Sequence, residues 1–255
     1  MLELVTDTEK TDATATPAAS ARALTPRQRA RTQTVADIVR LGRRHLALHG
    51  AAALSLRAVA RDLGVVSSAV YRYVESRDEL LTLLLIDAFN ELGDEVDAAI
   101  EAVPGDDHAG RFMAWGRAVR TWALREPASY ALLFGSPVPG YNAPAERTTG
   151  PGTRVIIALI GILESAFRAG RLAVEGGARA GIPAALQADL AAIRKQFGLT
   201  VPEELVARGL LVWSAVFGAV SFEAFRQYGP DTFSVPAELF DHNLAVLAGV
   251  AGLQA

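Results

Sequence analysis

The chain of 255 residues contains no cysteine. This absence excludes disulfide bonds, thiolate metal sites and cysteine nucleophiles, and it agrees with a reducing cytoplasm. Histidine is scarce, and there is neither a Gly-x-Ser-x-Gly elbow nor a Walker A loop. His45 and His49 share a helix face without a third ligand beside them, which favours packing or surface roles over metal binding. We therefore expect a protein that is not an enzyme and that holds no metal or cofactor.

A long uncharged apolar segment is also missing. The most apolar window, residues 209–222, lies between Arg208 and Glu223 and is 14 residues long, whereas a membrane span needs about 18 or more. Residues 1–20 have neither the basic start nor the apolar centre of a secretory signal. Apolar residues nevertheless make up 51% of the chain, enough for a buried core. We expect a cytoplasmic protein with no membrane association.

Charge is distributed unevenly along the chain. The formal net charge is −3, but residues 22–77 contain eleven arginines and only three acids, which gives that segment +8 and leaves −11 for the remainder. A basic end on an acidic body favours a polyanionic partner such as nucleic acid. A solvated basic surface accounts for the same charges equally well.

The pattern of the chain predicts an all-α fold. Residues 1–24 have no periodicity and are expected to form a disordered tail. Thr25 reads as a helix N-cap, and helical spacing continues from there with no convincing strand. Expected helices cover about 26–49, 55–64, 67–73, 77–103, 109–125, 128–134, 155–169, 186–197, 202–228 and 236–250, with a loop at 135–151 and a glycine-rich stretch at 176–181.

The segment from Ser55 to Leu81 carries the clearest functional signal. Its first short helix has an apolar inner face and ends at Gly64, which suits the left-handed residue of a sharp turn. The next helix is anchored by Val70 and Val74 and keeps serine, tyrosine and arginine on its outer side. This arrangement predicts a helix-turn-helix at about 55–74 whose second helix fits the major groove of DNA.

These motifs resemble the DNA-binding domain of the TetR family of bacterial transcriptional regulators. The matching segments are Ser55-Leu56-Arg57-Ala58-Val59-Ala60, Leu63-Gly64-Val65, Tyr71-Arg72-Tyr73 and Ser76-Arg77-Asp78-Glu79-Leu80. The sequence departs from the family pattern at Val74, at Arg77, at Val66-Ser67-Ser68 and at Leu41-Gly42. The resemblance implies a DNA-binding domain at 25–80 and a helical regulatory and dimerisation domain at 81–255.

The C-terminal half is similar to one TetR C-terminal subfamily. The similarity lies in residues 126–141 and 213–223. That subfamily carries tryptophan followed four residues later by His-Gly, and here Phe217 stands in the histidine position after Trp213. Any role that depends on that histidine does not carry over.

The DNA-contacting residues follow from charge, helix ends and the resemblance together. Ser55 and Ser67 are expected as N-caps that also meet phosphates, and Ser67, Ser68 and Arg72 as candidates for base edges. Arg72 has two alternatives, the DNA backbone or a contact within its own domain. Arg57 is equally consistent with a solvated or ion-paired role. The full expected set is Arg43, Arg44, Ser55, Leu56, Arg57, Ser67, Ser68, Tyr71, Arg72, Tyr73 and Arg77.

The resemblance also implies a small-molecule cavity in the C-terminal domain. Aromatic residues fall in the helices that form this cavity in TetR relatives, and as a group they predict a largely apolar site with few polar anchors. Ordinary core packing is the alternative for each of them. The expected ligand-binding residues are Trp115, Trp122, Tyr130, Phe134, Tyr141, Phe167 and Arg168.

The last two helices are predicted to form a homodimer. Residues 202–228 are apolar on too many faces for one neighbour, and TetR relatives pair through a four-helix arrangement of two late helices from each chain. The expected contacts are Leu210, Trp213, Phe217, Val220, Leu239, Phe240, Leu244 and Leu247. A two-fold dimer matches a palindromic DNA operator.

The sequence thus predicts a ligand-responsive, homodimeric, DNA-binding repressor with double-stranded DNA and an apolar small molecule as partners. The alternative is a helical small-molecule-binding protein with only weak, non-specific DNA binding. The arginine-rich N-terminal segment favours the first interpretation.

Overall fold

The computed structural model describes residues 25–173 and 181–253, and these form an all-α protein, as predicted. Its elements are α1 (Pro26–His49), a 3₁₀ turn η1 (Ala51–Ala53), α2 (Leu56–Asp62), α3 (Ser67–Tyr71), α4 (Arg77–Glu101), α5 (His108–Arg125), α6 (Pro127–Phe134), α7 (Ala145–Arg168), α8 (Ala184–Phe197), α9 (Glu203–Ala224) and α10 (Pro236–Ala251). The only strand-like pairing in these ranges is a single bridge between Leu172 and Leu253. The expected disordered tail and the glycine-rich stretch up to residue 180 lie outside the described residues.

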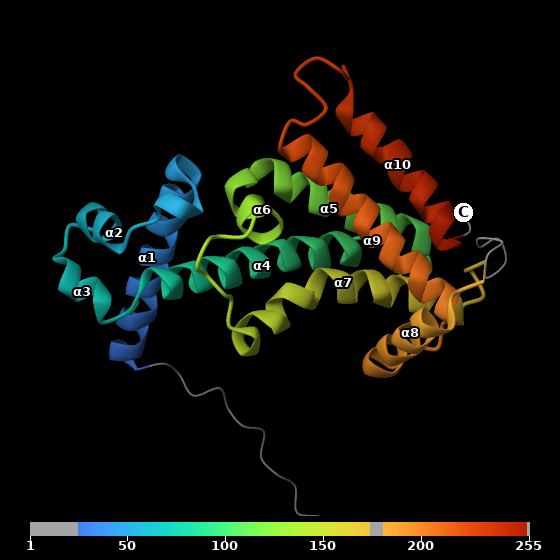
Figure 1. The fold of residues 1–255 in the computed structure, drawn as a ribbon, viewed down its shortest axis with the longest axis horizontal. Helices are drawn as coiled ribbons and strands as arrows, with labels where there is room; N and C mark the ends of the chain where they lie inside the picture. Colours follow the sequence, from blue (N-terminus) through green and yellow to red (C-terminus); the bar gives the residue numbers. More distant parts are fainter. Residues whose placement is uncertain (1–24, 174–180, 254–255) are drawn as a thin grey trace, which may run out of the picture.

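The helices α1, α2 and α3 form one end of the molecule (Figure 1). Thr25 caps α1 through a reciprocal capping box with Gln28, as the sequence predicts. The side chain of Ser76 accepts a hydrogen bond from the N–H of Glu79 and so caps α4. These helices and the first turns of α4 share a core of Ile38, Leu41, Leu54, Leu56, Val59, Ala60, Val70, Val74, Leu80, Leu81 and Leu84.

The long helix α4 runs from this end into the body (Figure 1). Its first half contributes Leu80, Leu81 and Leu84 to the N-terminal core. Its second half contributes Leu92 and Val96 to a larger core built with α5, α7, α9 and α10. The helix α4 therefore belongs to both cores and joins α1–α3 to the body.

The start of α7 differs from the sequence prediction. We expected a loop at 135–151 and a helix from 155, but α7 begins at Ala145 and continues through Pro151. A proline inside a helix costs about 3 kcal/mol because it lacks an N–H and crowds the preceding turn. Tertiary contacts hold this part of α7 against α4, since Arg147 forms a paired hydrogen bond with Glu79 and Arg154 binds Asp97.

Two other helix ends also differ from the sequence prediction. Val66, and not Ser67, is the N-cap of α3, so Ser67 is the first helical residue. The helix predicted over 202–228 ends at Ala224, because Arg226 has a left-handed φ of 56° that the helix cannot continue through.

Two helices, α7 and α9, are long and apolar enough by length and composition to cross a membrane. Neither helix contains a long uncharged run, so the absence of such a run from the sequence did not reveal them. One third of each window is buried inside this chain. Several apolar side chains of α9, such as Leu211 and Phe222, are exposed on the surface of the chain.

Candidate nucleic-acid interface

The two short helices α2 and α3 pack through small and apolar residues. Ala60 on α2 and Val70 on α3 are each 1% exposed, and Val74 is fully buried. Between the helices, Gly64 has a φ of 73°, a left-handed conformation that glycine adopts without steric penalty. The N–H of Val65 donates to the carbonyl oxygen of Ala60 at 3.1 Å. Close packing and a fixed turn therefore hold α3 in one orientation, as the sequence predicts.

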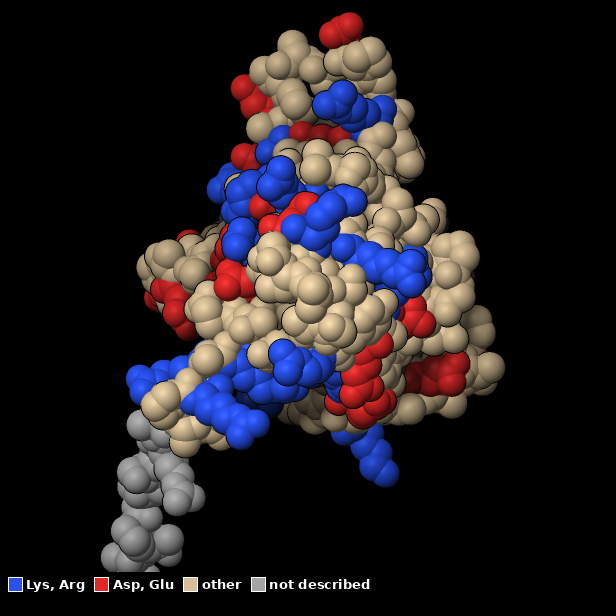
Figure 2. Space-filling model, turned by 90° about the vertical axis from the view of Figure 1, so that its left-hand side faces the viewer, with Lys and Arg blue, Asp and Glu red and all other residues tan. Residues whose placement is uncertain are grey.

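The outer face of α3 is polar and accessible. Tyr71 is 43% exposed, Ser68 and Arg72 are also exposed, and Ser67 is half-buried. Figure 2 views this end of the molecule and shows basic side chains spread over much of the face. A short helix with hydroxyl, phenol and guanidinium groups on one side provides donors for both phosphates and base edges.

Sequence reasoning missed one exposed apolar residue beside this face. Val66, the N-cap of α3, is 71% exposed. It was noted only as a departure from the family pattern. An accessible apolar side chain at the start of a recognition helix suits contact with a thymine methyl group, so Val66 joins the candidate residues.

Three arginines around α3 have no carboxylate partner. Within residues 25–173 and 181–253, no ion pair forms at Arg44, Arg57 or Arg72, and all three are exposed. Arg61 makes a loose ion pair, since its Nε lies 3.8 Å from Asp62 Oδ1 and its side chain is 78% exposed. The free guanidinium groups are therefore available to an anionic partner.

Arg43 has a different environment from the one expected of a DNA contact. Its guanidinium lies 3.2 Å from Asp87 and 2.5 Å from Glu91, both on α4, and 3.0 Å from Glu126 at the start of α6. Burial alone would lower the pKa of Arg43, but the hydrogen bonds to Glu126 and Glu91 outweigh it and raise the pKa. Arg43 thus joins α1 to the body, and its side chain is already committed to three carboxylates.

Arg77 is also engaged within the protein. Its Nη2 donates to the carbonyl oxygen of Ala51 at 2.9 Å, and its Nη1 lies 3.6 Å from Asp78. These groups offset the unfavourable position of a cation at a helix N-terminus. The position of Arg77 therefore needs no bound phosphate to account for it, and contact of Arg77 with DNA stays a prediction.

The remaining predicted DNA-binding residues differ in how accessible their side chains are. Leu56 is 4% exposed and belongs to the core, so its side chain is not accessible. Tyr73 is half-buried, and the guanidinium of Arg31 lies 5.4 Å from its ring centroid. Ser55 is the N-cap of α2, but its side chain makes no capping hydrogen bond, which leaves the hydroxyl to other partners.

A hydrogen bond between His45 and Asp62 joins α1 to α2. His45 Nε2 and Asp62 Oδ2 are 2.7 Å apart, and the histidine is 6% exposed. The hydrogen bond with His45 lowers the pKa of Asp62, with a smaller contribution from the charges of Arg61 and Arg44. The contact holds α2, which packs against α3, to α1.

This pKa shift predicts an acid-dependent stability. Because the folded-state pKa of Asp62 lies below its ordinary value of 3.8, the contribution is present above pH 3.8 and is lost as pH falls through the folded value. The urea midpoint of the Asp62→Asn variant should therefore fall less between pH 6 and pH 3 than that of the wild type. Asp106→Asn, at an exposed carboxyl before α5, is the matched control. Equal falls in Asp62→Asn and wild type would contradict the role of Asp62.

The predicted ligand-binding residues do not surround one cavity in the described chain. Trp115, Trp122 and Tyr130 are fully buried in the core, and Phe134 and Phe167 pack against it. The hydroxyl of Tyr141 lies 2.9 Å from Thr82 Oγ1 on α4, and Arg168 is a mostly exposed partner of Glu164. The alternative of ordinary core packing therefore describes the aromatic residues better.

The predicted dimerisation residues divide between the core and the surface. Phe217, Val220, Phe240 and Leu244 are buried within one chain, so a rigid partner cannot touch them. Leu210 is exposed, and Trp213, Leu239 and Leu247 are half-buried. The large apolar residues of α9, its C-cap and α10 that are exposed are the predicted Leu210 together with Leu211, Phe222, Phe225 and Val246, which the prediction missed. Apolar periodicity alone did not reveal which face of α9 meets its own core.

Two family profiles match the chain. Residues 38–84 match the profile described as bacterial regulatory proteins, tetR family. Residues 112–247 match the profile described as tetracyclin repressor-like, C-terminal domain. Together the two profiles cover the candidate interface and most of the helical body.

Individual proteins give the same result. The HTH-type transcriptional regulator Rv1816 of Mycobacterium tuberculosis is 47% identical over 224 residues, which cover 88% of this chain and 94% of that protein. The crystal structure of SCO4313, assigned as a regulatory protein, is 35% identical with a TM-score of 0.71 and covers 88% of this chain and 100% of that one. A TetR-family regulatory protein from Rhodococcus RHA1, at 16% identity and a TM-score of 0.58, covers 88% of this chain and 99% of that one and shares the fold.

Proposed function

The chain belongs to the TetR family of bacterial regulatory proteins, and from this premise we propose that it is a homodimeric repressor that binds a palindromic operator and responds to a small molecule. DNA-binding transcriptional regulation follows from the family. The dimer, the repression, the symmetry of the operator and the ligand response are the proposed parts. We further infer a DNA-binding domain at 25–80 and a regulatory domain at 81–255.

The observation that carries the proposal is the accessible polar face of α3. Ser68, Tyr71 and Arg72 share that face, and the unpaired Arg44 and Arg57 lie on neighbouring helices. In helix-turn-helix dimers, two such helices enter successive major grooves about 34–36 Å apart. Leu56 is excluded by its burial, and Arg43 is assigned a positioning role. The proposed contacts are Arg44, Ser55, Arg57, Val66, Ser67, Ser68, Tyr71, Arg72, Tyr73 and Arg77.

The proposed response to ligand operates through α4. Arg43 holds α1 to α4 and α6, while Tyr141 and Arg147 hold the α6–α7 region to the first turns of α4. A ligand that favours one arrangement of the body shifts the spacing of the two α3 helices. The loss of operator affinity then equals the difference in ligand affinity between the two conformers.

Selection from a random duplex library tests this function and yields the operator. The full-length protein is expected to enrich a sequence with two inverted half-sites whose centres are one helical turn, about 10 base pairs, apart. A library carried through the same rounds without protein is the control. Absence of any enriched sequence would favour the alternative of a ligand-binding protein with weak, non-specific DNA binding.

The Tyr71→Phe substitution tests contact with the DNA backbone. If the phenol donates to a phosphate, its loss should weaken binding to the selected operator and to random DNA by a similar factor, about tenfold to a hundredfold, since a hydrogen bond to a charged group contributes about 1.5–3 kcal/mol. Fluorescence anisotropy measures both affinities, and Tyr228→Phe in the body is the matched control. Unchanged affinity for both DNAs would show that Tyr71 makes no such contact.

A further inference from the structure

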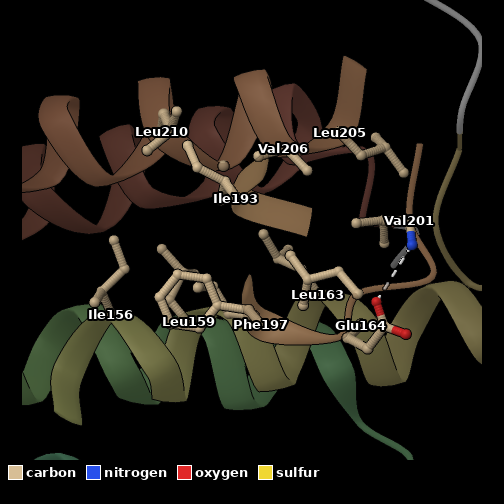
Figure 3. A pocket seen from close by; sticks show the side chains of 13 residues that line it. Ile156, Leu159, Leu163, Glu164, Ile193, Phe197, Val201, Leu205, Val206 and Leu210 are labelled. Atoms are coloured by element: carbon tan, nitrogen blue, oxygen red, sulfur yellow. Dashed lines mark hydrogen bonds between the residues drawn. The ribbon is translucent and has the colours of Figure 1, made fainter. Parts of the chain in front are cut away.

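A cavity of about 140 Å³ lies between α7, α8 and α9, at the end of the body away from α1–α3. Leu159 and Leu163 of α7, Ile193 of α8 and Val206 of α9 project into it (Figure 3). The other lining residues are also apolar, with the exception of Glu164. None of the residues that the sequence analysis assigned to a ligand lines this cavity.

Glu164 is not free to bind a charged molecule. Its carboxylate accepts hydrogen bonds from the N–H of Thr200 at 3.0 Å, from the N–H of Val201 at 3.3 Å and from Arg168 Nε at 2.9 Å. Burial alone would raise the pKa of Glu164, but the hydrogen bonds from Thr200 and Val201 outweigh it and lower the pKa. The carboxylate therefore stays charged, both of its oxygens are occupied, and it disfavours an anion nearby.

The helix α8 forms one wall of the cavity with little anchoring of its own. Leu190 is the only residue of α8 that is buried. The helix α8 packs chiefly against α9. An ion pair between Arg194 and Glu203 joins it to the start of α9. Leu186 and Phe197 remain 44% and 37% exposed. A wall held this lightly can move to admit a molecule.

We propose that this cavity binds a neutral, apolar molecule of about six to ten non-hydrogen atoms, such as a small aromatic hydrocarbon. Apolar cavities of about 150 Å³ stay dry and bind molecules of the size of benzene. A charged ligand has no free partner among the lining residues, and a polar one would lose its hydrogen bonds to water. This inference rests on the proposed ligand response and names its site and ligand class.

The site has a direct route to the proposed dimer. Val206 and Leu210 line the cavity from α9, and the adjacent Leu211 is 57% exposed on the apolar face of the same helix. A molecule that displaces α9 at the cavity therefore also displaces residues proposed to contact the second subunit.

Gly209 offers a substitution that fills the cavity. A Cβ added there would approach Leu163 Cδ1 at 3.4 Å, an ordinary contact, with no other neighbour within 4 Å. Gly209→Val therefore places methyl groups beside the lining leucine, and replacement of a glycine in a helix favours the fold. Gly161→Val on α7, at an exposed glycine outside the cavity with open space around it, is the matched control.

Binding of toluene, with benzoate as its charged counterpart, tests the proposal on the full chain by thermal denaturation and calorimetry. Toluene should raise the melting temperature of the wild type and of Gly161→Val in a concentration-dependent manner. The Kd for toluene should be at least tenfold higher in Gly209→Val than in the wild type. Benzoate should have no effect. Should Gly209→Val unfold, Gly209→Ala replaces it with a smaller expected loss. No binding of toluene, or equal binding to all variants, would overturn the proposal.

The same samples separate this site from the proposed function. Operator affinity is measured by anisotropy with and without toluene. Binding of toluene without any change in operator affinity would support the site and contradict the proposed ligand response. Release of the operator by another effector, together with no toluene binding, would overturn the site and leave the proposed function standing.

Discussion

Replacement of Leu211 by arginine is expected to convert the protein from a dimer to a monomer and to weaken operator binding by at least a hundredfold. Leu211 is 57% exposed on α9 and lies on an apolar face with Leu210 and Phe222. In a two-fold interface each substitution occurs twice. An uncompensated buried charge costs about 3–5 kcal/mol, which is a factor of a hundred or more.

Sedimentation velocity at micromolar concentration measures the first effect, and anisotropy on the selected operator measures the second. The substitution leaves the core intact because the side chain is exposed within one chain, so the melting temperature of the monomer tests for misfolding. Ile157→Arg, at an apolar residue of α7 that is 47% exposed, is the control for replacing an exposed aliphatic side chain by arginine outside the proposed interface. A Leu211→Arg protein that remains dimeric, or a wild type that is monomeric, would contradict the proposed interface.

The Arg72→Ala substitution is expected to lower operator affinity by about fivefold to a hundredfold and to relax sequence preference at a single base position. Arg72 follows α3, is exposed and has no ion pair in the described ranges. An arginine that donates two hydrogen bonds to guanine contributes about 1–3 kcal/mol of discrimination. The proposed contact is therefore specific and differs from the uniform loss expected for Tyr71→Phe.

Anisotropy with single-base variants of the operator distinguishes these roles. In the Arg72→Ala protein, the base change that costs the wild type most should cost little, while other positions keep their effects. Arg171→Ala, at an exposed residue after α7 far from α3, controls for the loss of one positive charge. Equal weakening on operator and random DNA would assign Arg72 to the DNA backbone.

The N-terminal helices were predictable because their signals are local. A capping box at Thr25, a glycine with positive φ at Gly64 and a serine cap at Ser76 determine where α1, the turn and α4 begin or end. The apolar spacing of Leu80, Leu81 and Leu84 matches their burial. These features depend on residues a few positions apart, so the sequence is sufficient to place them.

The corrections come from contacts between distant parts of the chain. Proline and glycine around residue 151 indicate a loop, yet Arg147 and Arg154 bind acids on α4 that the local pattern does not reveal. The sequence predicts that Arg43 contacts DNA, but in the structure Glu91 of α4 and Glu126 at the start of α6 bind its guanidinium. Which partner such an arginine binds depends on the tertiary packing, and the local sequence pattern does not show it.

The ligand and dimer residues illustrate the same limit. An apolar residue on α9 satisfies the helical pattern whether it meets its own core, as Val220 does, or remains exposed, as Leu211 does. The cavity between α7, α8 and α9 brings together residues as far apart in the sequence as Ile156 and Leu210. Family resemblance implied a site among the aromatic residues, but Trp115 and Trp122 fill the core there.

Sequence-specific recognition by α3 is tested most directly by the affinity of the wild-type protein for the selected operator and for a scrambled duplex, measured by anisotropy at several salt concentrations. We predict a preference of about a thousandfold or more for the operator at physiological salt, in the range of specific regulators. Both affinities should fall as salt rises, because phosphate contacts release counterions. Equal and weak affinity for the two duplexes would contradict sequence-specific recognition by α3 and leave only the basic surface to account for binding.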